Sequence, residues 1–311
     1  MDRFEAMSAF VAVSKAGSFS AVARELGIPL ATVSRRVADL EAELGVRLLH
    51  RSTRKLSLTS EGRDFFTSCV KILDDLREAT EQVTGEHKAL RGALTVTAPT
   101  GFGRLHLQPI VQSFLGENPS LQMRLILADQ VVNLVDERVD AAIRIAELPD
   151  STMVARTLGE VRVILCASPD YLARRGHPAH PCDLQSHDCI AWSTLVPLDG
   201  WWFRAEGLDR LFPIAVRLST TVAESAISAA EAGLGIVQTT SYQAEQSLRA
   251  GKLTMLLPEF ECKPTPVSLI YPGHRMLPLK VRSFVDFAAP KLERRLRSIS
   301  SAIDTPERLT V

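Results

Sequence analysis

Apolar residues recur at helical spacing in the segment TVSRRVADLEAELG, which begins at Thr32. On a helix that turns 100° per residue, one narrow stripe is apolar and consists of Val33, Val37, Leu40 and Leu44. The opposite side is polar and consists of Thr32, Arg35, Arg36 and Asp39. The pattern predicts a helix that packs through its apolar stripe and offers its polar side to another molecule.

Two further helices are predicted before this segment. The first ends before Gly17, and Ser18 is suited to cap the second because its hydroxyl can accept from a free backbone N–H. The second helix is expected to bury Val22 and Leu26 and to stop at Gly27. A short turn then leads into the third helix. The second and third helices therefore form a helix-turn-helix, whose last helix can lie in the major groove of DNA.

A basic segment follows the third helix. Two apolar pairs, Leu48 with Leu49 and Leu56 with Leu58, flank the polar tip RSTRK and predict a two-stranded wing. This segment carries several arginines and a lysine but no acid, although the whole chain has a formal net charge of zero. A solvated loop is the alternative for the basic strip alone, but beside a helix-turn-helix the strip predicts contact with DNA phosphates. The expected DNA contacts are Ser18, Thr32, Ser34, Arg35, Arg36, Arg51, Thr53, Arg54 and Lys55.

The run AGSFSAVARELGIPLATVSRRVADLEAELGVRLLHRSTRKLSLTSEG resembles the winged helix-turn-helix of LysR-type transcriptional regulators nearly end to end. One departure is the pair Pro29-Leu30, which stands where the family more usually has a polar pair. The resemblance implies a sequence-specific regulator that binds double-stranded promoter DNA. It also implies a C-terminal effector domain similar to a two-lobed periplasmic solute-binding protein.

A predicted helix from residue 60 to about residue 83 carries a seam of heptad type. The seam consists of Phe66, Cys69, Leu73, Leu76, Thr80 and Val83. A lone amphipathic helix can pack on its own domain, but the position of this one favours a partner helix from a second subunit. In the resembling family, the linker helix pairs two chains. We therefore expect a homo-oligomer, a dimer or a tetramer, with Cys69 as a small buried apolar residue.

Strands and helices alternate after Gly92. Strands are predicted at ALTVTA, LQMRLILA and DAAIRIA, with helices from about Arg104 to Gly116 and over DQVVNLVDERV. Two later strands, VRVILCAS and PVSLIY, are expected to cross between two lobes. The predicted fold class is α+β multidomain, with a winged helix-turn-helix at 1–59, a linker and dimerisation helix at 60–90, and a two-lobed α/β effector domain of periplasmic-binding-protein type at 91–303. Within that domain, lobe I comprises 91–162 and 266–303, and lobe II comprises 163–265.

A small-molecule effector is expected between the lobes, beyond the carboxyl ends of the strands, with carboxylates as one candidate class. Free backbone N–H groups at Thr100 and Thr221 are suited to an anion, and Arg144 is suited to a bidentate contact. A plain N-cap for each threonine and an ion pair for Arg144 are the alternatives. The candidate effector contacts are Thr100, Gly101, Phe102, Asp129, Gln130, Arg144, Trp202, Thr220, Thr221 and Gln238.

Composition narrows the functional class. No apolar run in the 311 residues approaches the roughly 20 residues of a membrane span, so no membrane partner is expected. Five cysteines at scattered spacings do not suggest disulfides, which favours a cytoplasmic location. No P-loop, nucleophile elbow, dinucleotide-binding motif or zinc-protease motif occurs, so neither catalysis nor a cofactor is predicted.

The segment HPAHPCDLQSHDC favours a different class of protein. It contains potential ligands for zinc or copper, namely His177, His180, Cys182, His187 and Cys189. Their spacings match no common zinc finger, and the resembling family carries a similar run with no metal implied, so no metal is expected.

The leading hypothesis is a DNA-binding regulator whose oligomer geometry is modulated by an effector, with RNA polymerase as a candidate further partner. One alternative is a DNA-binding protein whose α/β part is a ligand-free oligomerisation scaffold. The other is a metal-dependent binder or enzyme.

Overall fold

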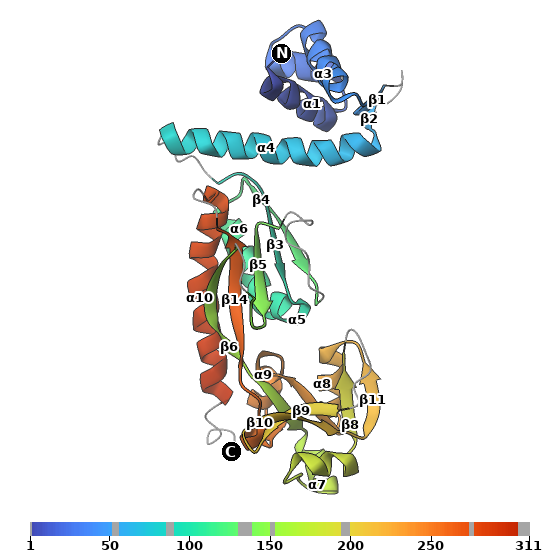
Figure 1. Ribbon diagram of the computed structural model, residues 1–311, viewed down its shortest axis with the longest axis vertical. Coiled ribbons are helices and arrows are strands. Elements are labelled where there is room, and N and C mark those ends of the chain that lie inside the picture. Colours follow the sequence, from blue (N-terminus) through green and yellow to red (C-terminus); the bar gives the residue numbers. More distant parts are fainter. Residues whose placement is uncertain are drawn as a thin grey trace. The chain divides into compact units, whose positions relative to one another are not determined.

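The computed structural model describes residues 2–51, 56–84, 90–129, 139–149, 153–193, 200–273 and 277–303. It divides into two compact units, Met1–Ala93 and Leu94–Val311 (Figure 1). Within the described ranges, every helix is too short or too polar to cross a bilayer.

The first unit is helical apart from one hairpin. In chain order its elements are α1 (Arg3–Ala16), α2 (Phe19–Leu26), α3 (Leu30–Leu44), β1 (Leu49–Arg51), β2 (Leu56–Leu58) and α4 (Ser60–Thr84). Gly17, Gly27 and Gly45 end the first three helices with φ of 62°, 64° and 70°, a left-handed conformation that suits glycine. Ser18 Oγ accepts from the backbone N–H of Ala21 at 3.3 Å. The three predicted helices and the predicted cap are therefore confirmed.

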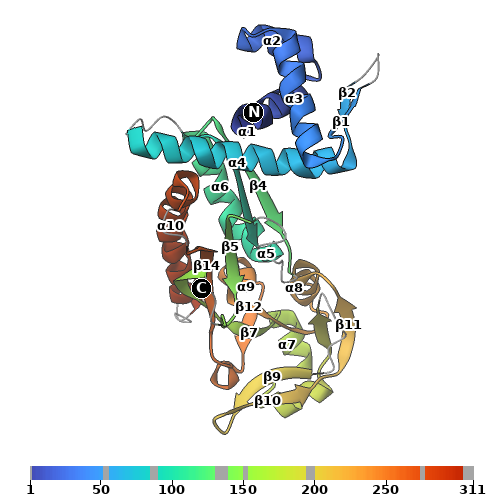
Figure 2. The same cartoon turned by 45° about the horizontal axis from the view of Figure 1, so that its top comes forward.

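The core of the first unit lies between α1, α3 and the start of α4. Phe10 of α1 and Val33, Val37 and Leu40 of α3 are fully buried, so the predicted apolar stripe faces the core. Strands β1 and β2 pair antiparallel, with Leu49 opposite Leu58, and form the predicted wing beside α3 (Figure 2).

Side chains of α3 and of the residue before α4 fix the wing. Glu41 Oε1 accepts from the backbone N–H groups of Leu48, at 2.8 Å, and Leu49, at 3.1 Å. Thr59 Oγ1 accepts from the N–H of Gly62 at 2.8 Å, as a cap for α4. A Cβ atom on Gly62 would lie 2.0 Å from the Leu48 carbonyl oxygen, so this close approach requires glycine. Helix α3 and the wing are thus held to each other through Glu41.

The first part of the seam on α4 is packed against its own domain, whereas Leu76, further along the helix, is exposed. Cys69 is fully buried, and Phe66 and Leu73 pack against the core of the first unit. The interpretation that the seam pairs with a second subunit is wrong for this half, because the helix packs on its own domain there. Leu76, further along, is 42% exposed. Burial raises the pKa of the Cys69 thiol to about 11, in agreement with its predicted role as a buried apolar residue.

Leu26 differs from the prediction. Val22 is fully buried as expected, but the Leu26 side chain is 49% exposed. Leu26 is the last residue of α2, directly before Gly27, where the chain turns away from the core.

Lobe I of the second unit is built on a mixed five-stranded sheet in the order β4-β3-β5-β14-β6. Its strands are β3 (Gly92–Ala98), β4 (Leu121–Leu127), β5 (Ala141–Ile145), β6 (Met153–Val161) and β14 (Thr265–Pro272). Strands β3 and β5 are parallel, whereas β14 runs antiparallel to β5 and β6. The three strands predicted from this region and the later strand PVSLIY are confirmed.

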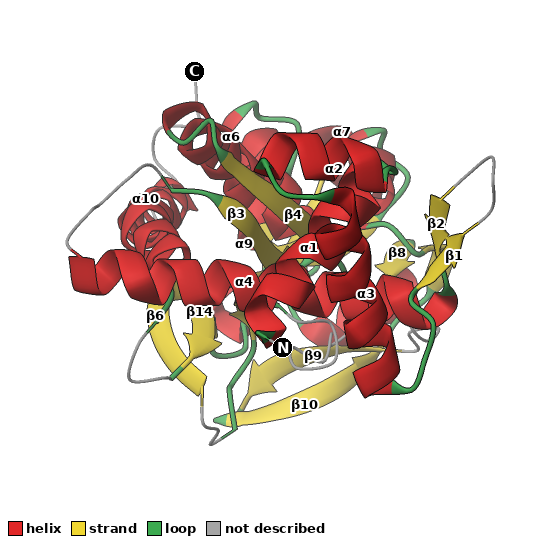
Figure 3. Ribbon diagram, turned by 90° about the horizontal axis from the view of Figure 1, so that it is seen from above, coloured by secondary structure: helices red, strands yellow, loops and turns green. Residues whose placement is uncertain are grey.

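Helices pack on this sheet. They are α5 (Thr100–Phe102), the π-helical segment η1 (Gly103–Leu107), α6 (Gln108–Glu117) and α10 (Leu279–Ile303). The helix predicted from about Arg104 thus begins earlier, at Thr100. Figure 1 shows α10 along β6 and β14, and Figure 3 shows β3 and β4 side by side. The helix predicted over DQVVNLVDERV lies almost wholly outside the described residues.

Lobe II contains a five-stranded sheet in the order β11-β8-β12-β7-β13 and a hairpin of β9 and β10. The strands are β7 (Val163–Ala167), β8 (Cys189–Trp192), β9 (Gly200–Ala205), β10 (Leu208–Pro213), β11 (Val216–Thr220), β12 (Ile236–Thr240) and β13 (Thr254–Leu256). The helical elements are α7 (Pro169–Arg175), the 3-10 turns η2 (Pro181–Ser186) and η3 (Pro258–Phe260), α8 (Ala223–Glu231) and α9 (Ser241–Arg249). The chain passes from lobe I into lobe II between β6 and β7 and returns in β14.

Candidate DNA-binding face and effector site

The polar side of α3 points outward because the opposite stripe is buried. Thr32 and Ser34 are half-buried, and the Arg35 side chain is 83% exposed. Thr32 and Arg35 line the same surface depression, so these two predicted contacts lie together.

The two adjacent arginines of α3 have different partners. Arg35 Nε lies 3.7 Å from Asp39 Oδ2, one turn further along the same helix. Arg36 Nη2 donates to Glu5 Oε2 on α1, and its side chain is only 26% exposed. Both arginines were predicted to contact DNA, but their side chains differ in exposure and in the residue with which they pair.

Both arginines line a depression of about 380 Å³ between the start of α1 and the first half of α3. The other lining residues are Asp2, Glu5, Ala31, Thr32 and Asp39. Guanidinium groups and carboxylates thus alternate over the surface that the sequence assigned to DNA.

The remaining predicted DNA contacts lie elsewhere. Ser18 uses its hydroxyl as the cap of α2, and Arg51 is the last residue of β1. Thr53, Arg54 and Lys55 lie outside the described residues. The sequence did not reveal the roles of Glu5 and Glu41, because neither partner lies at a local spacing that signals an interaction.

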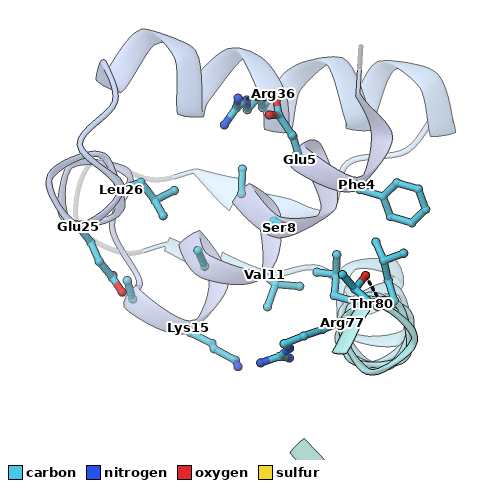
Figure 4. Close-up of a pocket in the computed structure, with 15 residues that line it drawn as sticks. Phe4, Glu5, Ser8, Val11, Lys15, Glu25, Leu26, Arg36, Arg77 and Thr80 are labelled. Atoms are coloured by element: carbon cyan, nitrogen blue, oxygen red, sulfur yellow. Dashed lines mark hydrogen bonds and ion pairs between the residues drawn. The ribbon is translucent and has the colours of Figure 1, made fainter. Parts of the chain in front are cut away.

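An apolar groove of about 970 Å³ runs between α1, α2 and α4. Its apolar lining includes Phe4, Val11, Leu26, Leu73 and Leu76. Figure 4 shows Phe4 and Val11 on α1 and Leu26 on α2, with α4 opposite. The exposed leucine at the end of α2 therefore belongs to a continuous apolar surface.

Four of the predicted effector contacts on lobe I, Asp129 among them, have structural roles. The Thr100 N–H is not free, because it donates to Asp129 Oδ1 at 2.8 Å. Phe102 is fully buried and stacks edge-on against Tyr242, so it is a core residue. A Cβ atom on Gly101 would lie 2.8 Å from Gln243 Nε2, so this glycine lets lobe I approach α9. The expectation of a free N–H at Thr100 is wrong, because a carboxylate of the chain itself accepts from it.

The other predicted effector contacts are dispersed. Arg144 lies on β5, where burial lowers the pKa of its guanidinium. Thr220 Oγ1 accepts from the N–H of Val222, which stands at the N-cap of α8 in place of Thr221. Gln238 lies in the middle of β12, against the expectation of a strand end, and its Nε2 donates to the Trp202 carbonyl at 3.3 Å. The Trp202 side chain is exposed. Gln130 lies outside the described residues.

Among the described residues, two ion pairs join helical segments of lobe I to helices of lobe II. Arg104 Nη2 on η1 donates to Glu224 Oε1 on α8 at 2.7 Å. Partial burial raises the pKa of Glu224, but hydrogen bonds from Arg104 and from backbone N–H outweigh it and hold the pKa below its ordinary value. Burial raises the pKa of the nearby Tyr242 hydroxyl to about 12, and the charges of Asp129 and Glu224 act in the same direction.

In the second of these pairs the carboxylate is buried, while the arginine is 38% exposed. Glu245 of α9 is almost fully buried and accepts two hydrogen bonds from Arg295 of α10, one of them 3.1 Å long, from Nη1 to Oε1. Arg295 Nε also donates to His106 Nδ1 at 3.4 Å. Burial, and then the Arg295 charge, lower the pKa of His106 from 6.5 to about 4. Sequence analysis missed this network, which joins residues far apart in the chain.

The histidine and cysteine cluster of lobe II makes structural contacts. His180 Nδ1 accepts from the N–H of Cys182 at 3.2 Å, and His187 Nδ1 lies 3.1 Å from the Tyr171 hydroxyl. Cys189 is fully buried. Among the described residues, no three histidine, cysteine or acidic side chains are grouped to hold a metal ion.

Two family models match the chain. The model for the bacterial regulatory helix-turn-helix protein, lysR family, matches residues 4–63. The model for the LysR substrate binding domain matches residues 87–293. Together they account for both units of the structure.

Similar proteins agree with these matches. The chain is 36% identical over 311 residues to an HTH-type transcriptional repressor of Pseudomonas aeruginosa, covering 98% of each chain. It is 32% identical to the solved structure of CrgA, a LysR-type transcriptional regulator from Neisseria meningitidis, with a TM-score of 0.59 over 93% of this chain and 98% of that one. The full-length Vibrio cholerae virulence activator AphB gives a TM-score of 0.58 at 29% identity over 91% and 97%. The winged unit, the two-lobed α/β unit and these matches show that the chain belongs to the LysR family of transcriptional regulators.

Proposed function

We propose that the polar side of α3 reads promoter DNA in the major groove, while the wing contacts the flanking phosphates. The main support is the orientation of α3, whose buried stripe holds Thr32, Arg35 and Arg36 on the outer surface. The bonds from Glu41 to the backbone of β1 and the residue before it keep helix and wing in one geometry, so both can meet a duplex together. Action at promoters supports a cytoplasmic location and makes RNA polymerase a candidate further partner.

The apolar groove supports homodimerisation as part of this function. Leu76 of α4 remains exposed beyond the half of the helix that packs on its own core, and Phe4 and Leu26 are exposed across the groove. Contiguous exposed apolar surface of this kind is typical of an interface. We assign it to α4 of a second copy, since one winged unit contacts too few base pairs for strong specificity.

The junction of lobes I and II is proposed as the effector site. Gly101 and Arg104 of lobe I meet Gln243 and Glu224 of lobe II there. A ligand that favoured one lobe geometry would shift the population of regulator conformations by its differential affinity. A carboxylate effector at α5 would have to displace Asp129 from Thr100. A role in regulation, rather than catalysis, gives each unit a function: the winged unit binds DNA and the two-lobed unit binds the effector.

The DNA-binding proposal is tested by replacing an exposed arginine of α3. Arg35→Ala should weaken binding of the full-length protein to a promoter duplex by about 1–3 kcal/mol, because a charged contact at the groove is lost. The measurement is fluorescence anisotropy at several salt concentrations, on the selected duplex and on a scrambled one.

Arg282→Ala is the charge-matched control, since Arg282 is exposed on α10 in the other unit. Equal affinity of the wild-type protein for the promoter and scrambled duplexes would contradict the proposal. So would an Arg35→Ala variant that binds both duplexes as tightly as the control.

A further inference from the structure

Arg36 is held from outside the helix-turn-helix. Its Nη2 donates to the carboxylate of Glu5, a residue of α1 that lies 31 positions earlier in the chain. Figure 4 shows the two side chains facing each other across α1 and α3. This one hydrogen bond uses one of the five N–H groups of the guanidinium, so four remain for another acceptor.

Glu5 itself is fixed by the start of α1. Asp2 caps that helix and accepts from the backbone N–H groups of Phe4 at 2.9 Å and Glu5 at 3.3 Å. A carboxylate in the first helical turn is also stabilised by the helix dipole. The backbone of Glu5 is therefore held in place, and its side chain, which is 54% exposed, reaches Arg36 from there.

Arg35 provides the comparison within the same depression. Its side chain is 83% exposed and its contact with Asp39 is longer, at 3.7 Å and one turn away on the same helix. Exposed i,i+4 pairs are weak, so Arg35 is free to move toward a phosphate. Arg36, with a side chain that is 26% exposed, keeps fewer conformations.

We propose that Glu5 is a positioning residue that holds Arg36 in place to read a base edge, and so sets base selectivity from outside the helix-turn-helix. A guanidinium with a fixed orientation can make the bidentate contact with guanine O6 and N7 and loses less conformational freedom on binding. A mobile arginine contacts phosphates of any sequence. The proposal rests on the proposed DNA-binding function and adds to it a residue that the helix-turn-helix pattern does not contain.

The test uses the full-length protein and a duplex library with a randomised central segment. Wild-type, Glu5→Gln and Arg36→Ala proteins are each used to select bound duplexes, and the base preference is compared position by position. We expect Glu5→Gln to reduce discrimination about 5- to 10-fold at the same positions that Arg36→Ala affects, as for the loss of one bidentate contact. Binding to scrambled duplex should not fall, because the substitution removes a negative charge near DNA.

Two further variants separate positioning from charge and from stability. Glu43→Gln removes the partner of Arg3, another ion pair between α1 and α3, and should keep the wild-type preference. Glu5→Asp keeps the charge on a shorter side chain. If Glu5 acts by positioning Arg36, this variant should weaken the base preference at the same positions of the duplex as Glu5→Gln does.

A Glu5→Gln profile identical to that of the wild type would overturn the inference. Changes at positions that Arg36→Ala does not affect would also overturn it. If the wild-type protein itself enriched no sequence, the proposed function would fail before the role of Glu5 was reached.

Discussion

The carboxylates of two ion pairs, one in each unit, differ in their access to water. In the winged unit, Arg36 and Glu5 pair at the surface, with side chains 26% and 54% exposed. In the second unit, the Glu245 side chain is 5% exposed and its partner Arg295 is 38% exposed. The first pair joins two helices of one small core, whereas the second pair, with its buried carboxylate, joins α9 of lobe II to α10 of lobe I.

An exposed ion pair and a pair with a buried carboxylate contribute differently to stability and to binding. A surface pair contributes little to folding, because water and salt screen it, so its arginine remains available to DNA. A buried carboxylate without its partners would be strongly destabilising, so Glu245 and Arg295 are committed to the folded structure. We expect substitutions in the winged unit to alter binding and substitutions in the interlobe network to alter stability.

The largest effect is expected for Glu245→Gln. The free energy of unfolding of this variant should be about 2–4 kcal/mol lower than that of the wild type, because Arg295 and Arg249 lose the carboxylate that neutralises them. Urea denaturation followed by far-UV circular dichroism measures this in both units. Tryptophan fluorescence reports on lobe II alone, since all three tryptophans of the chain, Trp192, Trp201 and Trp202, lie there. Glu43→Gln in the winged unit is the control, and an equal loss in both variants would remove the distinction between the units.

The pH dependence of stability should be the next largest effect. In the folded protein the pKa of His106 is lowered to about 4, so between about pH 6.5 and pH 4 the unfolded chain binds a proton that the folded chain does not. His106 should therefore destabilise the fold as pH falls through this window, by up to about 3 kcal/mol, and have no such effect above it.

His106→Phe should make stability less dependent on pH in this window. The same urea titrations at pH 7, 6, 5 and 4 measure the change. His177→Phe, at an exposed position of lobe II, is the matched control. A slope between pH 6.5 and pH 4 that is unchanged in His106→Phe would show that His106 is not buried in the neutral form.

The smallest effect is expected for Glu224→Gln. This variant removes the other interlobe pair, but Arg104 and Glu224 are 51% and 41% exposed. The loss of stability should be under about 1 kcal/mol, as for surface pairs in general. A loss as large as that of Glu245→Gln would mean that position between the lobes matters more than burial.

Sequence analysis succeeded in the winged unit because the signals there are local. Gly17, Ser18 and Gly27 mark helix ends within a few residues of the elements they terminate. The buried stripe of α3 could be read from spacing alone. Leu26 was predicted wrongly because its exposure depends on where α2 ends relative to the neighbouring helices.

The interlobe site was harder to predict because its contacts are distant in sequence. Glu245 and Arg295 are 50 residues apart, and Arg295 and His106 are 189 apart, so no spacing rule links them. The strand ends near Thr100 were identified, but the bond from Thr100 to Asp129 depends on how two loops meet. Phe102 carried no sign that it would be buried against α9.

The length of α4 has a consequence for operator geometry. Its 25 residues extend over about 37 Å at the usual helical rise, close to the roughly 34 Å repeat of B-form DNA. If two such helices paired antiparallel through the part that carries the exposed Leu76, one winged unit would lie at each end of the pair. The separation of the two half-sites of an operator would then be set by the overlap of the two helices, since each residue of overlap changes the span by about 1.5 Å.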